Sequence, residues 1–114
     1  MTIKMTNGFK MKVFLDDIRV PEDIHSDDGW ITVKNTAEVK RLLLTGKVTH
    51  LSLDNDVGLY QEEGFKVVSW MISNDIWPTE EVFVHSANVV RAKQMLIDIN
   101  KHFYNRKGES NNEV

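Results

Sequence analysis

The chain has 114 residues, of which 41% are apolar and 27% are charged, a balance typical of a single globular domain. It contains no cysteine, which excludes disulfides, thiol catalysis and cysteine-ligated metal sites and agrees with a cytoplasmic location. The net charge of −3 argues against non-specific nucleic-acid binding, and no apolar run reaches the roughly 20 residues that span a membrane.

Neither end of the chain carries the pattern of a folded element. Residues 1–10 show no sustained period and lack the apolar stretch of a secretory signal, so we expect a flexible N-terminal extension. Residues 105–114 are almost entirely polar, and we expect them to form a flexible tail. The sequence therefore predicts one domain over residues 11–104.

Between these ends, strand-like and helix-like segments alternate. Short β-prone runs predict strands at residues 13–15, 30–33, 50–53 and 82–84. Apolar residues at helical spacing predict helices at 35–45, 65–72 and 92–103, the first with a capping-box start at Asn35 and a stop at Gly46. Segment 18–29 contains Pro21 and little periodicity, so we expect a loop or one short turn there. This order predicts a mostly parallel sheet covered by helices on both faces.

Three of the four predicted strands end in polar clusters, at residues 16–19 (Asp-Asp-Ile-Arg), 54–56 (Asp-Asn-Asp) and 85–88 (His-Ser-Ala-Asn). Ligands of open parallel sheets bind beyond the carboxyl ends of the strands, so these clusters are expected to share one site. Asp, Asn and Ser also favour turns and helix starts, and capping explains any one cluster about as well. Three clusters together favour a functional site.

Gathering Asp16, Asp17, Asp54 and Asp56 would require a neutralising charge. Two carboxylates about 4 Å apart repel by several kcal/mol at an effective dielectric near 20. Oxygen ligands without cysteine suit Mg²⁺ or Mn²⁺, with Asp16, Asp17 and Asp54 as the predicted ligands. Arg19 is the alternative neutraliser and could hold a phosphate through two parallel hydrogen bonds. Both interpretations point to a phosphorylated ligand.

The cluster at residues 85–88 adds polar groups of a different kind. His85 is a candidate acid or base near neutral pH, although a single His at the end of an apolar strand is often structural. His25 lies in the long loop and could approach the site. Ser86 is expected to orient phosphate oxygens, and Asn88 either orients the substrate or caps the last helix.

At these motifs the sequence resembles receiver domains, the phospho-acceptor modules of two-component signalling. It resembles still more closely a divergent offshoot, the cyclic-phosphate processing receiver-like family, whose signature is similar to Leu-Asp-Asp-x-Arg (residues 15–19), Leu-Asp-x-Asp (53–56) and His-Ser-x-Asn (85–88). The resemblance runs from about Met11 to Phe103 and implies a flavodoxin-like domain with a four-stranded sheet of order 2-1-3-4. The sequence lacks the fifth strand and lysine of ordinary receivers, whereas Arg19, Asp56, His85 and Asn88 are additions that phospho-relay does not require.

This combination predicts a phosphoesterase-like hydrolase that opens a cyclic phosphate of a nucleotide or RNA-derived small molecule. Arg19 would clamp the phosphate, His85 would move a proton, Asp56 would position water or His85, and Ser86 and Asn88 would orient the substrate. Asp54 would bind the metal or attack phosphorus directly. The alternatives are a module that binds a cyclic or phosphorylated nucleotide without turnover, and a phospho-acceptor that uses Asp54. The oligomeric state is left open.

Overall fold

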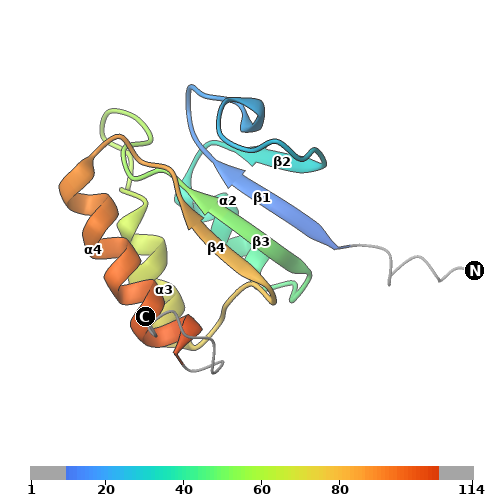
Figure 1. The fold of residues 1–114 in the computed structure, drawn as a ribbon, viewed down its shortest axis with the longest axis vertical. Coiled ribbons are helices and arrows are strands. Elements are labelled where there is room, and N and C mark those ends of the chain that lie inside the picture. The colour runs from blue at the N-terminus through green and yellow to red at the C-terminus, as the bar shows by residue number, and fades with distance from the viewer. Residues whose placement is uncertain (1–9, 106–114) are drawn as a thin grey trace, which may run out of the picture.

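The computed structural model describes residues 10–105 as one sheet with helices packed against it (Figure 1). All strand pairs are parallel, and the strand order is β2-β1-β3-β4. The strands are β1 (Met11–Leu15), β2 (Trp30–Val33), β3 (Val48–Leu53) and β4 (Glu81–Val84). The helical elements are the 3₁₀ turn η1 (Pro21–Asp23), α2 (Thr36–Leu43), α3 (Phe65–Asn74), α4 (Val89–Ile99) and the π-helical turn η2 (Asn100–Tyr104). The predicted fold class and sheet order are confirmed, and η1 is the short turn expected in place of a first crossover helix.

The boundaries of the elements differ modestly from the predicted ones. Strands β1 and β3 each begin two residues earlier than predicted, because the polar residues Lys12 and Thr49 separate Met11 and Val48 from the apolar runs. Helix α4 begins at Val89, where the Asn88 side chain accepts a hydrogen bond from the Arg91 amide. The predicted extension and tail fall, apart from residues 10 and 105, outside the described part of the chain.

The hydrophobic core lies on one face of the sheet. Helix α3 contacts both α2 and α4, and buried residues of the three helices join buried strand residues in one core cluster. The strand residues of this core include Val13, Leu15, Val33, Leu51, Leu53 and Val82, and the helices add Val39, Leu43, Val67, Val68, Met71, Met95 and Ile99. Within residues 10–105, no helix combines the length and the hydropathy needed to cross a bilayer.

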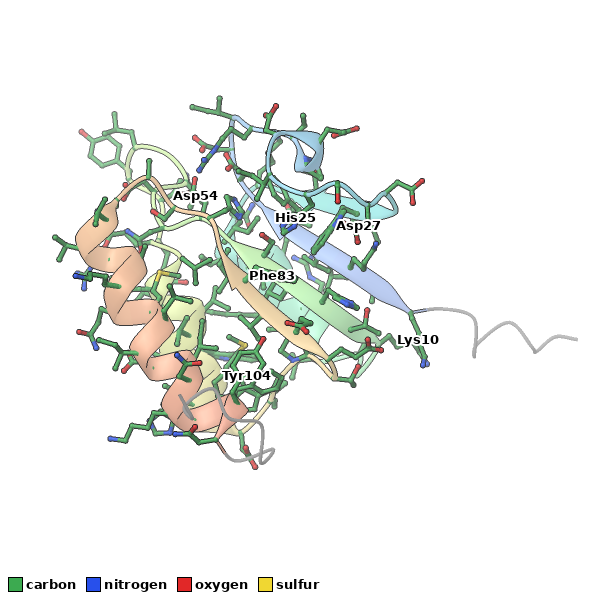
Figure 2. All side chains as sticks on the ribbon, viewed as in Figure 1. Lys10, His25, Asp27, Asp54, Phe83 and Tyr104 are labelled. Atoms are coloured by element: carbon green, nitrogen blue, oxygen red, sulfur yellow. The ribbon has the colours of Figure 1, made fainter. Side chains whose placement is uncertain are left out.

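The other face of the sheet, called here the open face, carries Lys12, Phe14, Trp30, His50, Ser52 and Phe83 in alternation with the core residues. Its rings contact one another and the ring of His25, which lies in the loop after β1 (Figure 2). None of α2, α3 and α4 contributes to this cluster of rings. The expectation of helices on both faces is therefore wrong for the described residues, because the first crossover is a loop with one 3₁₀ turn and not a helix.

Candidate functional site

The first residues after β1, β3 and β4 meet at the carboxyl edge of the sheet, where Figure 2 labels Asp54. The ladder of backbone hydrogen bonds runs one residue past the strands, so that the amides of Asp16 and His85 donate to the carbonyls of Val33 and Leu53. This register brings the side chains of Asp16, Asp54 and His85 together, with one nitrogen or oxygen atom of each within 4.8 Å of the others. The expected convergence of the three polar clusters is present in the structure.

A cleft of about 360 Å³ opens at this edge. The residues that line it come from the loops after β1, β3 and β4, and they are Asp16, Asp17, Ile18, Arg19, Asp54, Asp56 and Ala87. Arg19 is the one cationic residue among them. The cleft therefore combines an excess of carboxylates with a single guanidinium.

Asp16 accepts four hydrogen bonds from the surrounding loop and side chains. It is 1% exposed, and its Oδ1 accepts from the backbone N–H groups of Ile18 and Arg19, both at 2.9 Å. Its Oδ2 accepts from Nε of Arg19 at 3.0 Å and from Nε2 of His85 at 3.1 Å. Burial raises the pKa of Asp16, but these two amides, the charge of Arg19 and the interaction with His85 together outweigh burial and lower the pKa from its usual value. Asp16 is therefore ionised, and its four acceptor positions are filled.

Arg19 is held in place by the residue three positions before it. Its Nε donates to Asp16, and its Nη2 lies 3.5 Å from Oδ1 of Asp54. The Arg19 side chain is 32% exposed, so part of the guanidinium faces the cleft. A guanidinium with a fixed orientation at a cleft can bind a phosphate in a defined direction.

The pKa of Asp54 shifts in the opposite direction from that of Asp16. Burial raises the pKa of Asp54, the charge of Asp16 raises it further, and these effects exceed the lowering by the Asn55 amide and by Arg19. The Asn55 amide donates to Oδ1 of Asp54 at 2.8 Å. Two adjacent carboxyls whose pKa values shift apart form a pair in which one is the stronger acid and the other takes up a proton more readily.

The loop after β3 is locked onto the start of α3. The fully buried Asn55 accepts a hydrogen bond from the Phe65 amide through Oδ1, and its carbonyl accepts one from the Gly64 amide. A Cβ atom at Gly64 would lie 1.8 Å from the carbonyl oxygen of Asp54. Glycine is thus required at position 64 because the two backbones touch.

His85 lies behind Asp16 and does not line the cleft. Its side chain is 2% exposed, and its ring stacks on Phe14 with centroids 4.4 Å apart. Burial lowers the pKa of His85 to about 4, and Asp16 only partly opposes this effect. His85 is therefore neutral at pH 7, and it donates from Nε2 because the Asp16 carboxylate can only accept.

The structure places Ser86 and Asn88 in the cap of α4. Oγ of Ser86 accepts from the Asn88 amide at 3.0 Å, and Oδ1 of Asn88 accepts from the Arg91 amide at 3.1 Å. Neither residue lines the cleft. The capping interpretation of Asn88 thus matches its contacts, whereas a substrate-orienting role for either residue stays a prediction.

Asp17 and Asp56 are more accessible members of the cleft lining. Asp56 is exposed, and its Oδ1 accepts from Nδ2 of Asn55 at 3.1 Å. Asp17 is half-buried, and its carbonyl accepts from Nζ of Lys34 at 3.4 Å. Both carboxylates can reach a ligand in the cleft, but neither contacts His85.

A divalent ion at this edge would need oxygen or nitrogen atoms that are free to coordinate it. In the part of the chain that the structure describes, the one group of three acidic or His side chains able to surround an ion is Asp16, Asp54 and His85, without Asp17. Asp16 has no acceptor position left, and Nε2 of His85 carries a proton. An ion would have to displace Arg19 or His85, so the residues in this arrangement do not fit a resident ion at Asp16.

Sequence reasoning assigned no role to Ser52 or Asn55. Ser52 is fully buried, and its Oγ lies 2.7 Å from Nδ1 of His85 and 2.8 Å from Nε2 of His25. The available signal was the alternation of His50 and Ser52 with Leu51 and Leu53, which marks a polar sheet face without a covering helix. Asn55 lies inside the motif at residues 53–56, and an Asn just after a strand is compatible with a loop anchor.

Comparison with known proteins agrees with this geometry. A family model described as the cyclic-phosphate processing receiver domain matches residues 11–101, which include every residue of the cleft. No curated protein and no solved structure matches the chain. The match covers well over half of the chain, so the protein belongs to the cyclic-phosphate processing receiver domain family.

Proposed function

We propose that this protein hydrolyses a cyclic phosphodiester, carried by a nucleotide or an RNA-derived small molecule, in the cleft at the carboxyl edge of the sheet. The observation that carries the proposal is the position of Arg19 between two carboxyls whose pKa values shift in opposite directions. That arrangement supplies an anion-binding group and a proton-carrying group side by side. The family description, which names cyclic-phosphate processing, supports the same chemistry.

Arg19 is proposed to bind the phosphate. Its Nε is committed to Asp16, and the remaining N–H groups, on the side of the cleft, can donate to two phosphate oxygens. The charge of the bound phosphate is unfavourable beside ionised Asp16 and Asp54. A proton on Asp54 reduces this repulsion, and the raised pKa of Asp54 favours that protonated form.

Asp54 and Asp56 are proposed to divide the proton transfers. Asp56, exposed at the cleft, takes a proton from the attacking water while the water oxygen bonds to phosphorus. The bond from phosphorus to one ester oxygen breaks, and that oxygen receives the proton held by Asp54. The products are a phosphate monoester and a free hydroxyl. His85 does not contact the substrate, and it donates a hydrogen bond that orients the Asp16 carboxylate.

A divalent cation on Asp16, Asp17 and Asp54 is a competing proposal that requires Arg19 or His85 to leave Asp16 first. No step above uses a metal, because the acceptor positions of Asp16 are filled. Calorimetric titration with Mg²⁺ and Mn²⁺, with and without a cyclic nucleotide, separates the two ideas. Heat of binding at millimolar ion that disappears in Asp54→Asn would favour the metal, and its absence would favour Arg19.

Turnover is tested by incubating the protein with 2′,3′-cyclic nucleotides and following the phosphorus NMR signal of the monoester. Arg19→Gln and Asp54→Asn should each lower kcat/KM by at least about tenfold, since each removes a charge-assisted contact or a proton donor. Arg91→Gln, which removes a guanidinium paired with Glu63 outside the cleft, is the matched control. Equal rates in all three variants would refute the site assignment.

The same incubation distinguishes the alternative functions. Tight binding with the ligand recovered intact would identify a module that binds without turnover. A protein whose intact mass rises by the mass of the ligand, and does so only when Asp54 is present, would show direct attack by Asp54. Labelling of Asp54 by acetyl phosphate would point to a phospho-acceptor, although the described residues contain no fifth strand with the lysine of ordinary receivers.

A further inference from the structure

A continuous chain of hydrogen bonds runs from the cleft through the sheet to the open face. Oδ2 of Asp16 lies 3.1 Å from Nε2 of His85, and Nδ1 of His85 lies 2.7 Å from Oγ of Ser52. Oγ of Ser52 lies in turn 2.8 Å from Nε2 of His25. Both His rings are held by stacking, His85 on Phe14 and His25 on Trp30, each with centroids 4.4 Å apart.

The charge of Asp16 fixes the direction of every bond in this chain. Oδ1 of Asp16 accepts from two backbone amides and Oδ2 accepts from Nε of Arg19, so both oxygens act as acceptors. His85 therefore carries its proton on Nε2 and presents a bare Nδ1. The hydroxyl of Ser52 must then donate to His85, which leaves its oxygen to accept from Nε2–H of His25. All donors thus point toward Asp16, and the bare nitrogen of the chain is Nδ1 of His25.

The far end of the chain is accessible, whereas its middle is not. Ser52 is fully buried and the His85 side chain is 2% exposed, but His25 is half-exposed on the open face (Figure 2). Among residues 10–105, Nδ1 of His25 has no hydrogen-bond partner. Within the described residues, the end of the chain opposite the cleft therefore reaches solvent through His25, on the side of the sheet away from the helices.

We propose that His25, Ser52 and His85 form a polarised proton path from the open face to Asp16. A proton binds Nδ1 of His25, and the Nε2 proton of His25 moves to Oγ of Ser52. The hydroxyl proton of Ser52 moves to Nδ1 of His85, and the Nε2 proton of His85 moves to Oδ2 of Asp16. One proton enters and one arrives at Asp16, both rings end as neutral Nδ1–H tautomers, and every bond of the chain is reversed.

The use of such a path rests on the proposed function. Asp54 must regain a proton in each turnover, and a product in the cleft blocks access from that side. The carboxyl of Asp16 lies within 4.8 Å of Asp54, a distance that one bridging water spans. His25 and Ser52 are thus positioning residues for proton delivery and need no contact with substrate.

The test reads histidine tautomers by two-bond ¹H–¹⁵N NMR, assigned with His25→Gln and His85→Gln. In the wild type, both His25 and His85 should be Nε2–H tautomers. In Asp16→Asn, the two backbone amides keep the amide oxygen at the Oδ1 position, so the NH₂ group faces His85. His85 must then accept, and both His85 and His25 should switch to Nδ1–H.

Matched variants make the outcome decisive. In Asp16→Asn combined with Ser52→Ala, His85 should still switch but His25 should not, and His50, which lies on the same face outside the chain, should not respond in any variant. The proposal would be overturned if His25 were the Nδ1–H tautomer in the wild type, or if the tautomer of His25 did not change in Asp16→Asn. The wild-type tautomers and Ser52→Ala suffice if Asp16→Asn does not fold.

The tautomers need no turnover, so their result is independent of the proposed function. If the protein does hydrolyse a cyclic phosphate, Ser52→Ala should lower kcat at least about threefold with KM unchanged, and Ser52→Thr, which restores the hydroxyl, should recover most of the loss. An unchanged kcat in Ser52→Ala, together with the expected tautomers, would overturn the delivery role and leave the hydrolysis itself standing.

Discussion

Replacing Arg19 by Gln tests the electrostatic basis of the site. In the structure, Nη2 of Arg19 lies 3.5 Å from Oδ1 of Asp54, which corresponds to an attraction of about 5 kcal/mol at an effective dielectric near 20. The Arg19 side chain is about one-third exposed, so solvent screening reduces this to roughly 2–3 kcal/mol. Because about 1.4 kcal/mol corresponds to one pKa unit, the pKa of Asp54 should rise by about two in Arg19→Gln.

The stability of the variant should then depend on pH in a defined direction. A carboxyl whose pKa is higher in the folded than in the unfolded protein stabilises the fold below its unfolded pKa, and this contribution is lost as pH rises through the folded pKa. The pKa of Asp54 is already raised in the wild type, and Arg19→Gln moves the folded value further up. The free energy of unfolding of Arg19→Gln, relative to wild type, should therefore be lower at pH 7 than at pH 5.

Two measurements check this reasoning. Carboxyl ¹³C NMR titration gives the pKa of Asp54 directly, and urea unfolding at pH 5 and pH 7 gives the stabilities. Arg91→Gln, which removes an equal charge from a half-exposed residue on α4, should leave the pKa of Asp54 where it is. A pKa of Asp54 that stays constant or falls in Arg19→Gln would refute the argument that Arg19 neutralises this pair.

Three further predictions follow from single contacts. Gly64→Ala should destabilise the protein by at least about 3 kcal/mol in urea unfolding, because its Cβ would lie 1.8 Å from the Asp54 carbonyl oxygen and α3 would have to move; a loss below 1 kcal/mol would contradict the close approach. Asn88→Ala at the cap of α4 and Asn35→Ala at the cap of α2 should each lower the free energy of unfolding by about 1 kcal/mol. A loss of ligand affinity in Asn88→Ala but not in Asn35→Ala would instead show that Asn88 contacts the substrate. Because the pKa of His85 is lowered to about 4 in the folded protein, the free energy of unfolding should fall as pH drops from about 6.5 toward 4. His85→Gln should reduce this loss of stability by roughly 3 kcal/mol. An equal pH dependence in both proteins would argue against a buried neutral His85.

The sequence predicted the fold and the convergence of the three polar clusters because both depend on local patterns. Strand–helix alternation and the polar residues directly after three strands were sufficient to bring Asp16, Asp54 and His85 to one edge. The short turn η1 was predicted for a local reason as well, the proline at position 21. These features need no knowledge of how the strands are ordered beyond the parallel arrangement.

The connections inside the site could not be predicted in this way. Ser52 looks like an ordinary strand residue, and it gains a role only because β3 lies between β1 and β4 and the loop after β1 folds over the open face. The burial of His85 depends on Phe14, 71 positions earlier in the chain, whose ring covers it. Such contacts arise from tertiary packing, which local propensity and spacing do not describe.

The spacing of the first motif has a physical explanation in Asp16. One carboxylate folds the loop through the amides of Ile18 and Arg19, and its second oxygen binds the Arg19 side chain and the His85 ring. An arginine three residues after the aspartate is the one that this turn brings back onto the same carboxylate. Asp16 therefore orders the loop after β1 and orients the guanidinium of Arg19 toward the cleft. The Asp16 carboxylate also sets the direction of the hydrogen bonds that run to His25, so it affects both the cleft and the open face.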